Sequence, residues 1–386
     1  MVLNKLKLIN ALGTVLCVVG LSSSVNAEDE ISDNPNNHSL SGSLSSTLVY
    51  TDNTALYGKK GTKIVNQLVL NDSYSISDHL TLVGSVNINN TVHDNYESQV
   101  DYASVNCNIN LYGVTSNIRL GRVKYDIGLL EAKRNNPASR YAVFLPLSSY
   151  FPAFDRYAQS LDGLQIELTK SGSIGNLTAS STYGKAILHK GDQSDIFFGY
   201  FHVPLDGTFT TTEPVSSHTI KFQNLHWKIQ YNVTTVDVLY DHDPAPTPIN
   251  QRHADVAMHH RMHTTGIRYE NEDMFLSGEY IEHDLLTEPI AWFIRGGFNV
   301  SEKTIIYGGY ATLFHGNNVP SPLKTKSPYD RTGEEYSVGI THYYTPKLML
   351  KAQYSTGKGT VWFSHPASEP EWSILSLSVV YKFDLI

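Results

Sequence analysis

Beyond its first segment, the chain has no long hydrophobic run, and it has very few cysteines. Its two cysteines are Cys17 and Cys107, and Cys17 lies in an amino-terminal apolar run that we expect to be removed. The single remaining cysteine cannot form an intramolecular disulfide. After residue 21, no apolar stretch reaches the ~20 residues that a membrane-spanning helix requires. These absences exclude a disulfide-rich scaffold and a bundle of transmembrane helices.

Positive charge is also scarce. Lys5 and Lys7 are the only charged residues among the first 27, so the remainder carries 27 Lys and Arg (29 less these two) against 37 Asp and Glu, a net charge of −10. This balance argues against a nucleic-acid partner, which would need a basic face. Aromatic residues are abundant, with 24 Tyr, 14 Phe and 4 Trp beside a mean hydropathy of −0.24. This profile favours a transmembrane β-barrel over its alternative, a soluble extracellular array of β-sandwiches.

The first 27 residues have the pattern of a secretory signal peptide. Lys5 and Lys7 precede the apolar run Leu8–Leu21, and the small residues of Ser22–Ala27 follow. A run of about 14 residues is too short to span a membrane as a helix, so we expect cleavage after Ala27 instead of a retained anchor. The predicted organisation is a signal peptide at 1–27, a short periplasmic leader at 28–38 and a barrel domain at 39–386.

Alternation of apolar and polar side chains predicts strands along most of the chain. The last strand is the clearest, because Leu375, Leu377 and Val379 alternate with serines, and it favours closure onto the first strand. The segment 195–202 also looks like a strand, but counting it would give an odd total, so we place it in a loop. The sixteen predicted strands are Leu40–Tyr50, Lys63–Ser75, Leu80–Thr91, Gln99–Leu111, Asn117–Asp126, Leu161–Lys170, Gly175–Gly184, His218–Tyr231, Val233–Asp241, His263–Glu270, Met274–His283, Ala291–Asn299, Thr304–Phe314, Glu334–Tyr344, Lys347–Ser355 and Trp372–Asp384.

The connections between these strands alternate strictly between short and long. An up-and-down barrel in an asymmetric membrane has this rhythm, with tight turns on one side and long loops on the other. We therefore predict an all-β fold, a transmembrane up-and-down antiparallel β-barrel of about 16 strands, wide enough for a water-filled lumen. The short turns are at Ser77–His79, Gly113–Ser116, Ser171–Ile174, Asn232, Asn271–Asp273, Ser301–Lys303 and Thr345–Pro346; the long loops are 51–62, 92–98, 127–160, 185–217, 242–262, 284–290, 315–333 and 356–371.

With these features, the chain resembles the Gram-negative outer-membrane porin superfamily. The segment from Leu120-Gly121-Arg122 to Gln159 is similar to the fifth strand and inward-folded long third loop of porins. The resemblance implies an outer-membrane location in contact with lipid and lipopolysaccharide, a homotrimer, and a channel. Porins usually end on Phe, with apolar residues at every second position upstream, a pattern that the barrel-assembly machinery recognises. Here Phe383 takes that place, although Asp384-Leu385-Ile386 follow it.

The loop 127–160 is the main candidate for a functional site. Its aromatic residues, among them Phe144, Tyr150 and Phe154, would expose apolar surface if the loop extended into water. Folded into the lumen, the loop would narrow the pore, and its charges would select solutes. The alternative is an external loop packed over neighbouring loops or over a second barrel. The charged candidates in the loop are Glu131, Lys133, Arg134, Arg140, Asp155 and Arg156.

The strand before this loop carries three cations, Arg119, Arg122 and Lys124. Strict alternation separates Arg119 from the other two, and a charge on the lipid face near mid-membrane costs ~2–4 kcal/mol. A bulge at Gly121 would return all three to the lumen, where we expect them to form a basic ladder opposite acidic residues of the loop. The alternative is that Arg122 and Lys124 lie at the outer rim and bind lipopolysaccharide phosphates.

The segment 242–263 is rich in histidine. His259 and His263 are four residues apart, a spacing that suits two ligands of one metal only on a helix. Prolines at 244, 246 and 248 favour an extended chain, so we interpret the segment as a solvated, pH-responsive loop without a metal. Cys107 has the same parity as Val105 and Ile109, which predicts a lipid-facing thiol.

Tyrosines near strand ends fit the aromatic girdles of a membrane protein, although they also fit sugar-stacking platforms inside a lumen. Strand alternation does not decide between these two positions. The residues concerned are Tyr50, Tyr112, Tyr125, Tyr183, Tyr240, Tyr310 and Tyr344.

The expected function is passive diffusion of small hydrophilic solutes across the outer membrane, which needs no catalytic group and no cofactor. A channel selective for anions, sugars or carboxylates is the nearest alternative. A barrel enzyme acting on lipids is not favoured, because the sequence contains no Gly-flanked Ser nucleophile motif. A non-channel adhesin or receptor is a further alternative, in which the external loops bind another surface.

Overall fold

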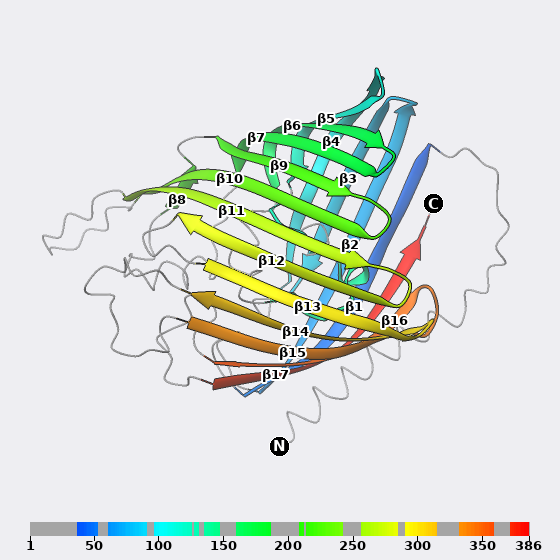
Figure 1. Ribbon diagram of the computed structural model, residues 1–386, viewed down its shortest axis with the longest axis vertical. Helices are drawn as coiled ribbons and strands as arrows, with labels where there is room; N and C mark the ends of the chain where they lie inside the picture. Colours follow the sequence, from blue (N-terminus) through cyan, green and yellow to red (C-terminus); the bar gives the residue numbers. More distant parts are fainter. Residues whose placement is uncertain are drawn as a thin grey trace, which may run out of the picture.

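The computed structural model describes residues 37–52, 61–90, 96–125, 127–130, 135–146, 160–186, 208–211, 214–241, 256–284, 290–314, 332–358 and 371–385. Within these ranges, no helix is long and apolar enough to cross a membrane. Antiparallel strands dominate (Figure 1). The elements are β1 (His38–Thr51), β2 (Gly61–Ser77), β3 (Leu80–Asn89), β4 (Glu97–Leu111), β5 (Val114–Lys124), η1 (Pro137–Ser139), β6 (Ser160–Gly172), β7 (Gly175–Ala186), β8 (Thr208–Thr211), β9 (Val215–Gln223), β10 (Trp227–Asp241), β11 (Val256–Glu270), β12 (Met274–Asp284), β13 (Ile290–Ser301), β14 (Thr304–Phe314), β15 (Thr332–Tyr343), β16 (Leu348–Lys358) and β17 (Glu371–Asp384).

The strands form one closed antiparallel barrel. β1 pairs with both β2 and β17, so that Leu48 lies opposite Ile64 on one side and Leu377 on the other. β8 and β9 both pair with β10, and together they occupy one of sixteen positions around the wall. The predicted all-β, sixteen-stranded up-and-down barrel is therefore confirmed. Closure pairs every strand on both sides, which satisfies the backbone without an open sheet edge.

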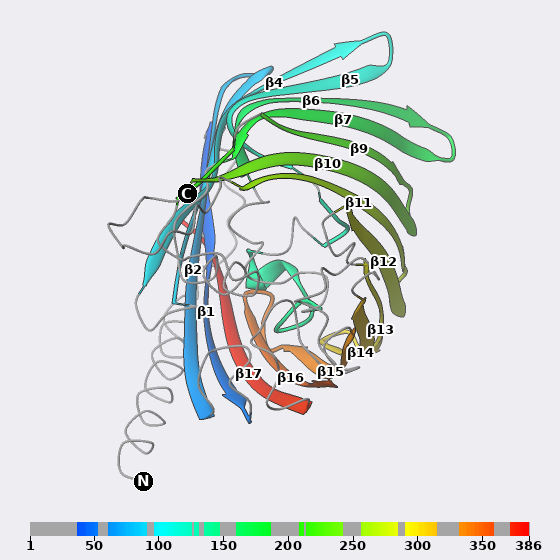
Figure 2. The same ribbon diagram turned by 90° about the vertical axis from the view of Figure 1, so that its left-hand side faces the viewer.

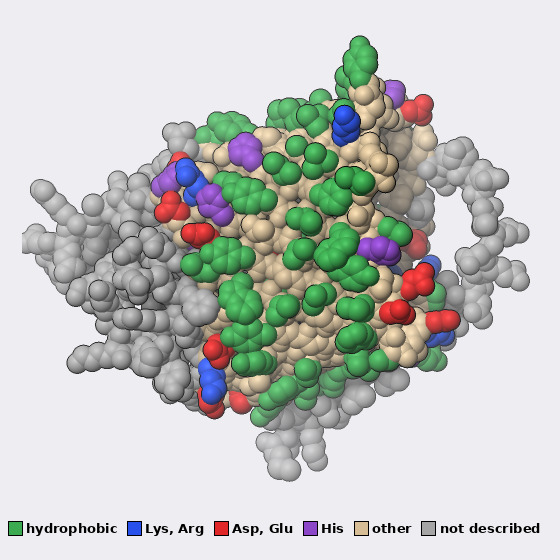
Figure 3. Space-filling model, in the orientation of Figure 1, with side chains coloured by type: hydrophobic (Ala, Val, Ile, Leu, Met, Phe, Trp, Pro, Cys, Tyr) green, Lys and Arg blue, Asp and Glu red, His purple; other side chains and the backbone are tan. Residues whose placement is uncertain are grey.

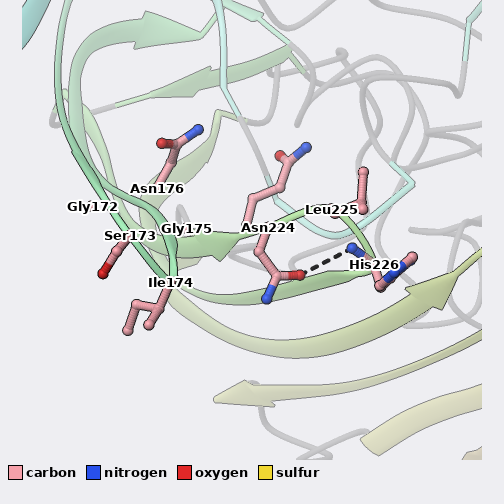
Figure 4. A pocket seen from close by; sticks show the side chains of 9 residues that line it. Gly172, Ser173, Ile174, Gly175, Asn176, Asn224, Leu225 and His226 are labelled. Carbon is pink, nitrogen blue, oxygen red and sulfur yellow. Dashed lines mark hydrogen bonds between the residues drawn. The ribbon is translucent and has the colours of Figure 1, made fainter.

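The short turns gather at one end of the barrel, at the right in Figure 1. Several turns begin with a side chain that accepts hydrogen bonds from the turn backbone. Asn224 Oδ1 accepts from the backbone N–H of His226 at 3.0 Å (Figure 4). It also accepts from the backbone N–H of Trp227 at 2.8 Å. Asn271 caps the β11–β12 turn in the same way. These short polar side chains favour turns because they take the place of a backbone hydrogen-bond partner.

One predicted turn is wrong. A turn was predicted at Asn232, but this residue lies within β10 and is completely buried. Its amide nitrogen donates to the hydroxyl groups of Ser217 and Thr219 on β9, each at 2.9 Å. The turn between β9 and β10 is instead at residues 224–226. A buried asparagine can form its hydrogen bonds with side chains of the neighbouring strand on the lumen face. In the sequence, such an asparagine looks the same as one in a turn.

The turn between β4 and β5 is shorter than predicted. Tyr112 and Gly113 have φ values of 54° and 78°. Two successive positive φ values are what a two-residue type I′ hairpin requires. β5 therefore begins directly at Val114, before the predicted start at Asn117.

The outward side chains form an apolar band. In Figure 3, hydrophobic side chains cover the middle of the visible surface, while Lys, Arg, Asp and Glu lie mainly near its edges. Aromatic residues contact each other across strands near both ends of the band. Trp292, Tyr310 and Tyr336 lie near the loop end, with ring centroids 5.2 and 4.9 Å apart. Trp227 and Tyr269 lie near the short turns, 4.9 Å apart. An apolar band between aromatic belts is the surface of a barrel in lipid.

The register places several predicted residues. Cys107 lies opposite Leu80 and Ile118 on the outward face, as its strand parity predicts. Tyr310 belongs to the loop-end aromatic belt. Tyr125 does not belong to a girdle, because it is only 1% exposed and packs inside the barrel. The side chain of Tyr240 lies outside the described part of the chain.

The inward face has three zones along the barrel axis. Near the long loops it is apolar and buried, and a single cluster joins residues from most strands of the wall. Farther from the long loops it is mainly polar, with Thr47, Gln165, Gln353 and Ser376 among its buried residues. Close to the short turns, Phe275, Ile305 and Tyr307 form a smaller apolar group with Ala142 of the loop. The apolar cluster consists of Val49, Val65, Val123, Tyr125, Ile127, Leu161, Ala186, Val215, Met262, Ile281, Ala291, Leu313, Trp372 and Ile374.

Candidate functional site

The segment 135–146, part of the connection between β5 and β6, lies inside the barrel (Figure 2). Ser43 on β1 donates to Asn136 Oδ1 at 3.1 Å, and the Tyr141 hydroxyl donates to Glu270 on β11 at 2.6 Å. These contacts join the segment to distant parts of the wall. The predicted inward-folded third loop is confirmed, and the external alternative is excluded for this segment.

The first anchor of the loop is on β2 and β4. Gln67 donates to the carbonyl oxygen of Asn135 at 2.7 Å, and the Asn135 amide donates to Asp101 at 2.9 Å. The next residue, Asn136, caps η1, because its Oδ1 accepts from the backbone N–H of Ala138 at 2.9 Å. Pro137 follows at the first helical position, where its missing N–H has no consequence. The local sequence Asn-Pro therefore starts the helical turn, and its neighbours attach it to the wall.

The second anchor is a buried lysine. Lys351 on β16 is only 4% exposed. Its ammonium group donates to the carbonyl oxygens of Pro137 at 2.6 Å and Arg140 at 2.5 Å. A charged group inside a protein needs such acceptors, since burial without them is costly. Of the predicted loop residues, Arg140 thus contributes its backbone carbonyl to the attachment, and its side chain is half-buried.

The deepest anchor is Tyr141. Its ring stacks on Phe275, with centroids 5.0 Å apart, and the Arg268 guanidinium lies 5.9 Å from the ring centroid. Burial, followed by the hydrogen bond to Glu270, raises the pKa of Tyr141 well above its ordinary value, so the phenol stays a hydrogen-bond donor. The Tyr141 carbonyl accepts from Thr341 at 2.5 Å. Since Glu270 is the last residue of β11, the loop reaches the short-turn end of the barrel.

The loop is also held on its way back. The backbone N–H of Phe144 donates to Gln353 Oε1 at 3.0 Å, and Arg295 donates to the Phe144 carbonyl at 3.3 Å. Near the start of the loop, the N–H of Leu129 donates to Glu279 at 2.5 Å. The Leu129 side chain fills the space above Gly266, where an added Cβ would be 2.4 Å from Leu129 Cγ. The glycine on β11 thus makes room for the loop.

The predicted bulge at Gly121 is absent. Gly121 pairs in unbroken register with Ser104 on β4 and Gly163 on β6, so Arg119 and Arg122 lie on opposite faces. A Cβ at Gly121 would be 2.5 Å from the Ala103 carbonyl oxygen. The glycine is needed because the two strands approach each other closely here. A glycine within a strand can mark either a bulge or such a close approach, and the sequence alone does not distinguish the two.

The three predicted cations therefore have different environments. Arg119 faces the lumen, where it donates to Gln165 at 2.7 Å and lies 3.8 Å from Glu167. Arg122 faces outward and forms an ion pair with Asp162 at 3.0 Å. Pairing explains how Arg122 is tolerated there. Lys124 ends β5 with the parity of Arg122, and it also lines a polar cavity beside the loop.

The bulge of this region is on the neighbouring strand. The β3–β4 register shifts between Ser85 and Val86, and Asp101 and Tyr102 occupy the shifted position. Both residues line the cavity inside the barrel. A β-bulge brings two consecutive side chains to one face, which alternation cannot predict.

The remaining predicted residues, Glu131, Lys133, Arg134, Asp155 and Arg156, lie outside the described residues. Three residues that contact the loop, Arg268, Arg295 and Lys351, were not predicted from the sequence. Each follows directly after an apolar residue that faces outward, and therefore faces inward itself. The outward residues are Ile267, Ile294 and Leu350. Strand parity at basic residues was therefore the signal that could have identified them.

The histidines of β11 do not form a common metal site. His259 and His263 both face outward in a strand, and at ~3.3 Å per residue they are ~13 Å apart along it. Each has its own partner: His259 Nδ1 lies 2.5 Å from Asp237, and His263 Nδ1 lies 2.9 Å from the Tyr231 hydroxyl. Among the residues that the structure describes, no group of three His, Cys, Asp or Glu is arranged to hold a metal.

Comparison with known proteins gives matches in structure only. No protein-family model matches the chain, and no curated protein matches it by sequence. The structure is similar to OmpT, an outer membrane protein of Vibrio cholerae, in its trimer form (TM-score 0.57, 13% identity, 90% of this chain and 99% of that chain). It is similar to an anion-selective porin from Comamonas acidovorans (TM-score 0.58, 11% identity, 90% and 99%). It is also similar to the outer membrane channel DcaP of Acinetobacter baumannii (TM-score 0.58, 11% identity, 90% and 97%). At these identities the likeness establishes the fold alone: this chain has the sixteen-stranded barrel fold of Gram-negative outer-membrane porins.

Proposed function

We propose that the protein is an outer-membrane porin through which small hydrophilic solutes diffuse passively. The observation that carries this proposal is the loop 135–146, which is held inside a polar-walled barrel by Lys351, Glu270 and Gln353. A loop fixed in this way narrows the lumen by steric exclusion and presents hydrogen-bonding groups to passing solutes. Passive diffusion requires no reacting group, so the proposal includes no catalytic step and no cofactor.

The charges of the lumen give the channel its selectivity. We assign Arg119 and Arg140 to the selective region, together with Glu131, Lys133, Arg134, Asp155 and Arg156 of the loop. Lys124 belongs to the edge of this region, and Arg122 acts at the outer surface through its pair with Asp162. Basic side chains on the inward face favour an anion-preferring channel as the second candidate: Lys221, Lys228, Arg268, Arg295 and Lys351.

The surroundings of the barrel follow from the same proposal. Residues 1–27 export the chain as a signal peptide and are removed near Ala27, and residues 28–38 stay in the periplasm. The apolar band contacts membrane lipid, and polar residues at the loop end contact lipopolysaccharide. The barrel-assembly machinery recognises the carboxyl-terminal strand, and three barrels form a homotrimer. The outward apolar face of β17, with Leu375 and Leu377 nearly half exposed, supports contact with lipid.

Reconstitution of the purified protein into planar lipid bilayers tests this proposal. We expect discrete conductance steps in triplets, and a reversal potential across a salt gradient that reports the sign of the selectivity. Uptake of radiolabelled small solutes into proteoliposomes provides the second measurement. A protein that inserts into lipid but conducts neither ions nor solutes would contradict the proposal and favour an adhesin or receptor.

A further inference from the structure

A cavity of about 620 Å³ lies inside the barrel beside the loop. Residues of β1 to β5 form one wall, and Asn135 and Asn136 of the loop form the other. Its volume is within the range of small-molecule sites, roughly 300–1,000 Å³. The anchor between Asn135 and Asp101, at 2.9 Å, keeps the loop against this part of the wall. The cavity is therefore a fixed feature of the lumen and lies on the side of Arg119.

The lining of the cavity consists mainly of hydroxyl and amide groups. Ser41, Asn71, Ser85, Ser104 and Asn106 all contribute. Ser104 donates to Asn106 Oδ1 at 2.8 Å, so these groups already form a network of donors and acceptors. A hydroxyl or amide both donates and accepts, and its natural complement is a ligand whose groups do the same.

The β4 bulge adds an aromatic ring to this polar lining. The register shift at Ser85 and Val86 directs Tyr102 into the cavity together with Asp101. The Tyr102 hydroxyl is 3.5 Å from Asn71 Oδ1, which orients the phenol along the wall. An apolar ring face among hydroxyl and amide groups matches a molecule that has C–H surfaces as well as hydroxyls.

Three charged side chains line the cavity, Asp101, Arg119 and Lys124, and the first two already have hydrogen-bond partners. Asp101 accepts from Asn135, and Arg119 donates to Gln165 at 2.7 Å and lies 3.8 Å from Glu167. A ligand with a net charge would have to compete with these partners. A neutral ligand leaves them intact.

We propose that this cavity is a binding subsite for a neutral sugar of one or two rings, with Tyr102 as the stacking platform and Asn71, Ser85 and Asn106 as hydrogen-bonding groups. This inference rests on the proposed channel function and defines the class of solute that the lumen retains. Sugars bind there from the aqueous lumen, and the subsite makes their passage saturable.

Bilayer recordings with glucose, sucrose and glucuronate as probes test the subsite. We expect each neutral sugar to reduce the ion current in a saturable way, and glucuronate to bind more weakly. Replacement Tyr102→Ser, which removes the ring, should raise the half-blocking sugar concentration about tenfold. Tyr102→Phe keeps the ring and should stay within about threefold of the unmodified protein. Ser180→Ala, an inward position on β7 away from the cavity, is the matched control.

The outcomes separate the subsite from the channel itself. If the unmodified protein conducts but shows no saturable block by sugars, or prefers glucuronate, the subsite is wrong and the channel stands. If it does not conduct, the proposed function fails. Should Tyr102→Ser not fold, Asn106→Ala provides the same test from another residue of the lining, and an unchanged sugar block in that variant contradicts the proposal.

Discussion

The ammonium nitrogen of Lys351 and the carbonyl oxygen of Pro137 lie 2.6 Å apart inside the barrel. This contact joins β16 to a helical turn of the loop more than two hundred positions earlier in the sequence. Arg140 provides a second carbonyl acceptor to the same nitrogen. One buried side chain therefore fixes both ends of a short loop segment, and the position of the loop depends on it.

Replacement Lys351→Met should release this part of the loop. It leaves two carbonyl groups without their charged donor, and hydrogen bonds to charged groups contribute ~1.5–3 kcal/mol each. We expect noisier single-channel currents, a higher mean conductance and a lower unfolding temperature in detergent. Lys358→Met is the control, because Lys358 is exposed at the loop end of the same strand and forms an ion pair with Glu371 at 3.5 Å. If the single-channel current of Lys351→Met were no noisier than that of the unmodified protein, the other contacts would be sufficient to hold the loop.

Replacement Gly266→Ala should displace the start of the loop. The added Cβ would be 2.4 Å from Leu129 Cγ, and such overpacking costs ~1–3 kcal/mol. We expect a lower unfolding temperature and an altered conductance, since Leu129 must move away from β11. Gly278→Ala on β12 is the matched control, because its nearest neighbour, the Phe293 carbonyl, is at 3.4 Å. Equal behaviour of the two variants would mean that the loop does not depend on this contact.

Replacements of Arg119 and Arg122 by Glu should differ in their effect on ion selectivity. Arg119 faces the lumen, so Arg119→Glu changes the charge by two units beside the path of the ions. The reversal potential across a salt gradient should shift toward cation preference. Arg122→Glu changes the outward face next to Asp162, where we expect little change in selectivity but a loss of stability from two adjacent carboxylates. A large shift of the reversal potential in Arg122→Glu would contradict the assigned faces.

Replacement Tyr141→Phe should have a pH-dependent effect. The folded protein raises the pKa of Tyr141 above its ordinary value of 10.0, mainly through burial. The contribution of the protonated phenol is therefore complete below the ordinary pKa and is lost as the pH rises through the raised one. We expect a constant difference in unfolding temperature between the two proteins from about pH 6 to 9, which narrows in strong alkali. A difference that changes near neutral pH would point to another group.

Local sequence determined the strands and their number, because alternation and turn residues act over a few positions. The strand Thr304–Phe314 was predicted with its observed bounds, and most other boundaries differ by three residues or fewer. The large differences are at the end of β9 and at the starts of β10 and β11. The long loop was also recognisable, since its aromatic residues need a buried environment.

Local patterns failed where one residue type serves two purposes. Asn232 was read as a turn, although its amide is satisfied by β9 across the lumen face. Gly121 was read as a bulge, although it allows β5 to approach the Ala103 carbonyl. In each case the partner lies on another strand, so the residue itself carries no information that separates the two roles.

By itself, the sequence determined an amphipathic chain that can satisfy its backbone only as a closed barrel, with an apolar outer band and a loop that needs burial. Only the tertiary structure decided which face each cation takes, where the wall bulges to bring Tyr102 inward, and that Lys351 and Glu270 hold the loop. The physical reason is the distance along the chain over which each effect acts. Side-chain alternation follows from the geometry of one strand, whereas these contacts exist only after sixteen strands have closed and distant positions have come within hydrogen-bonding distance.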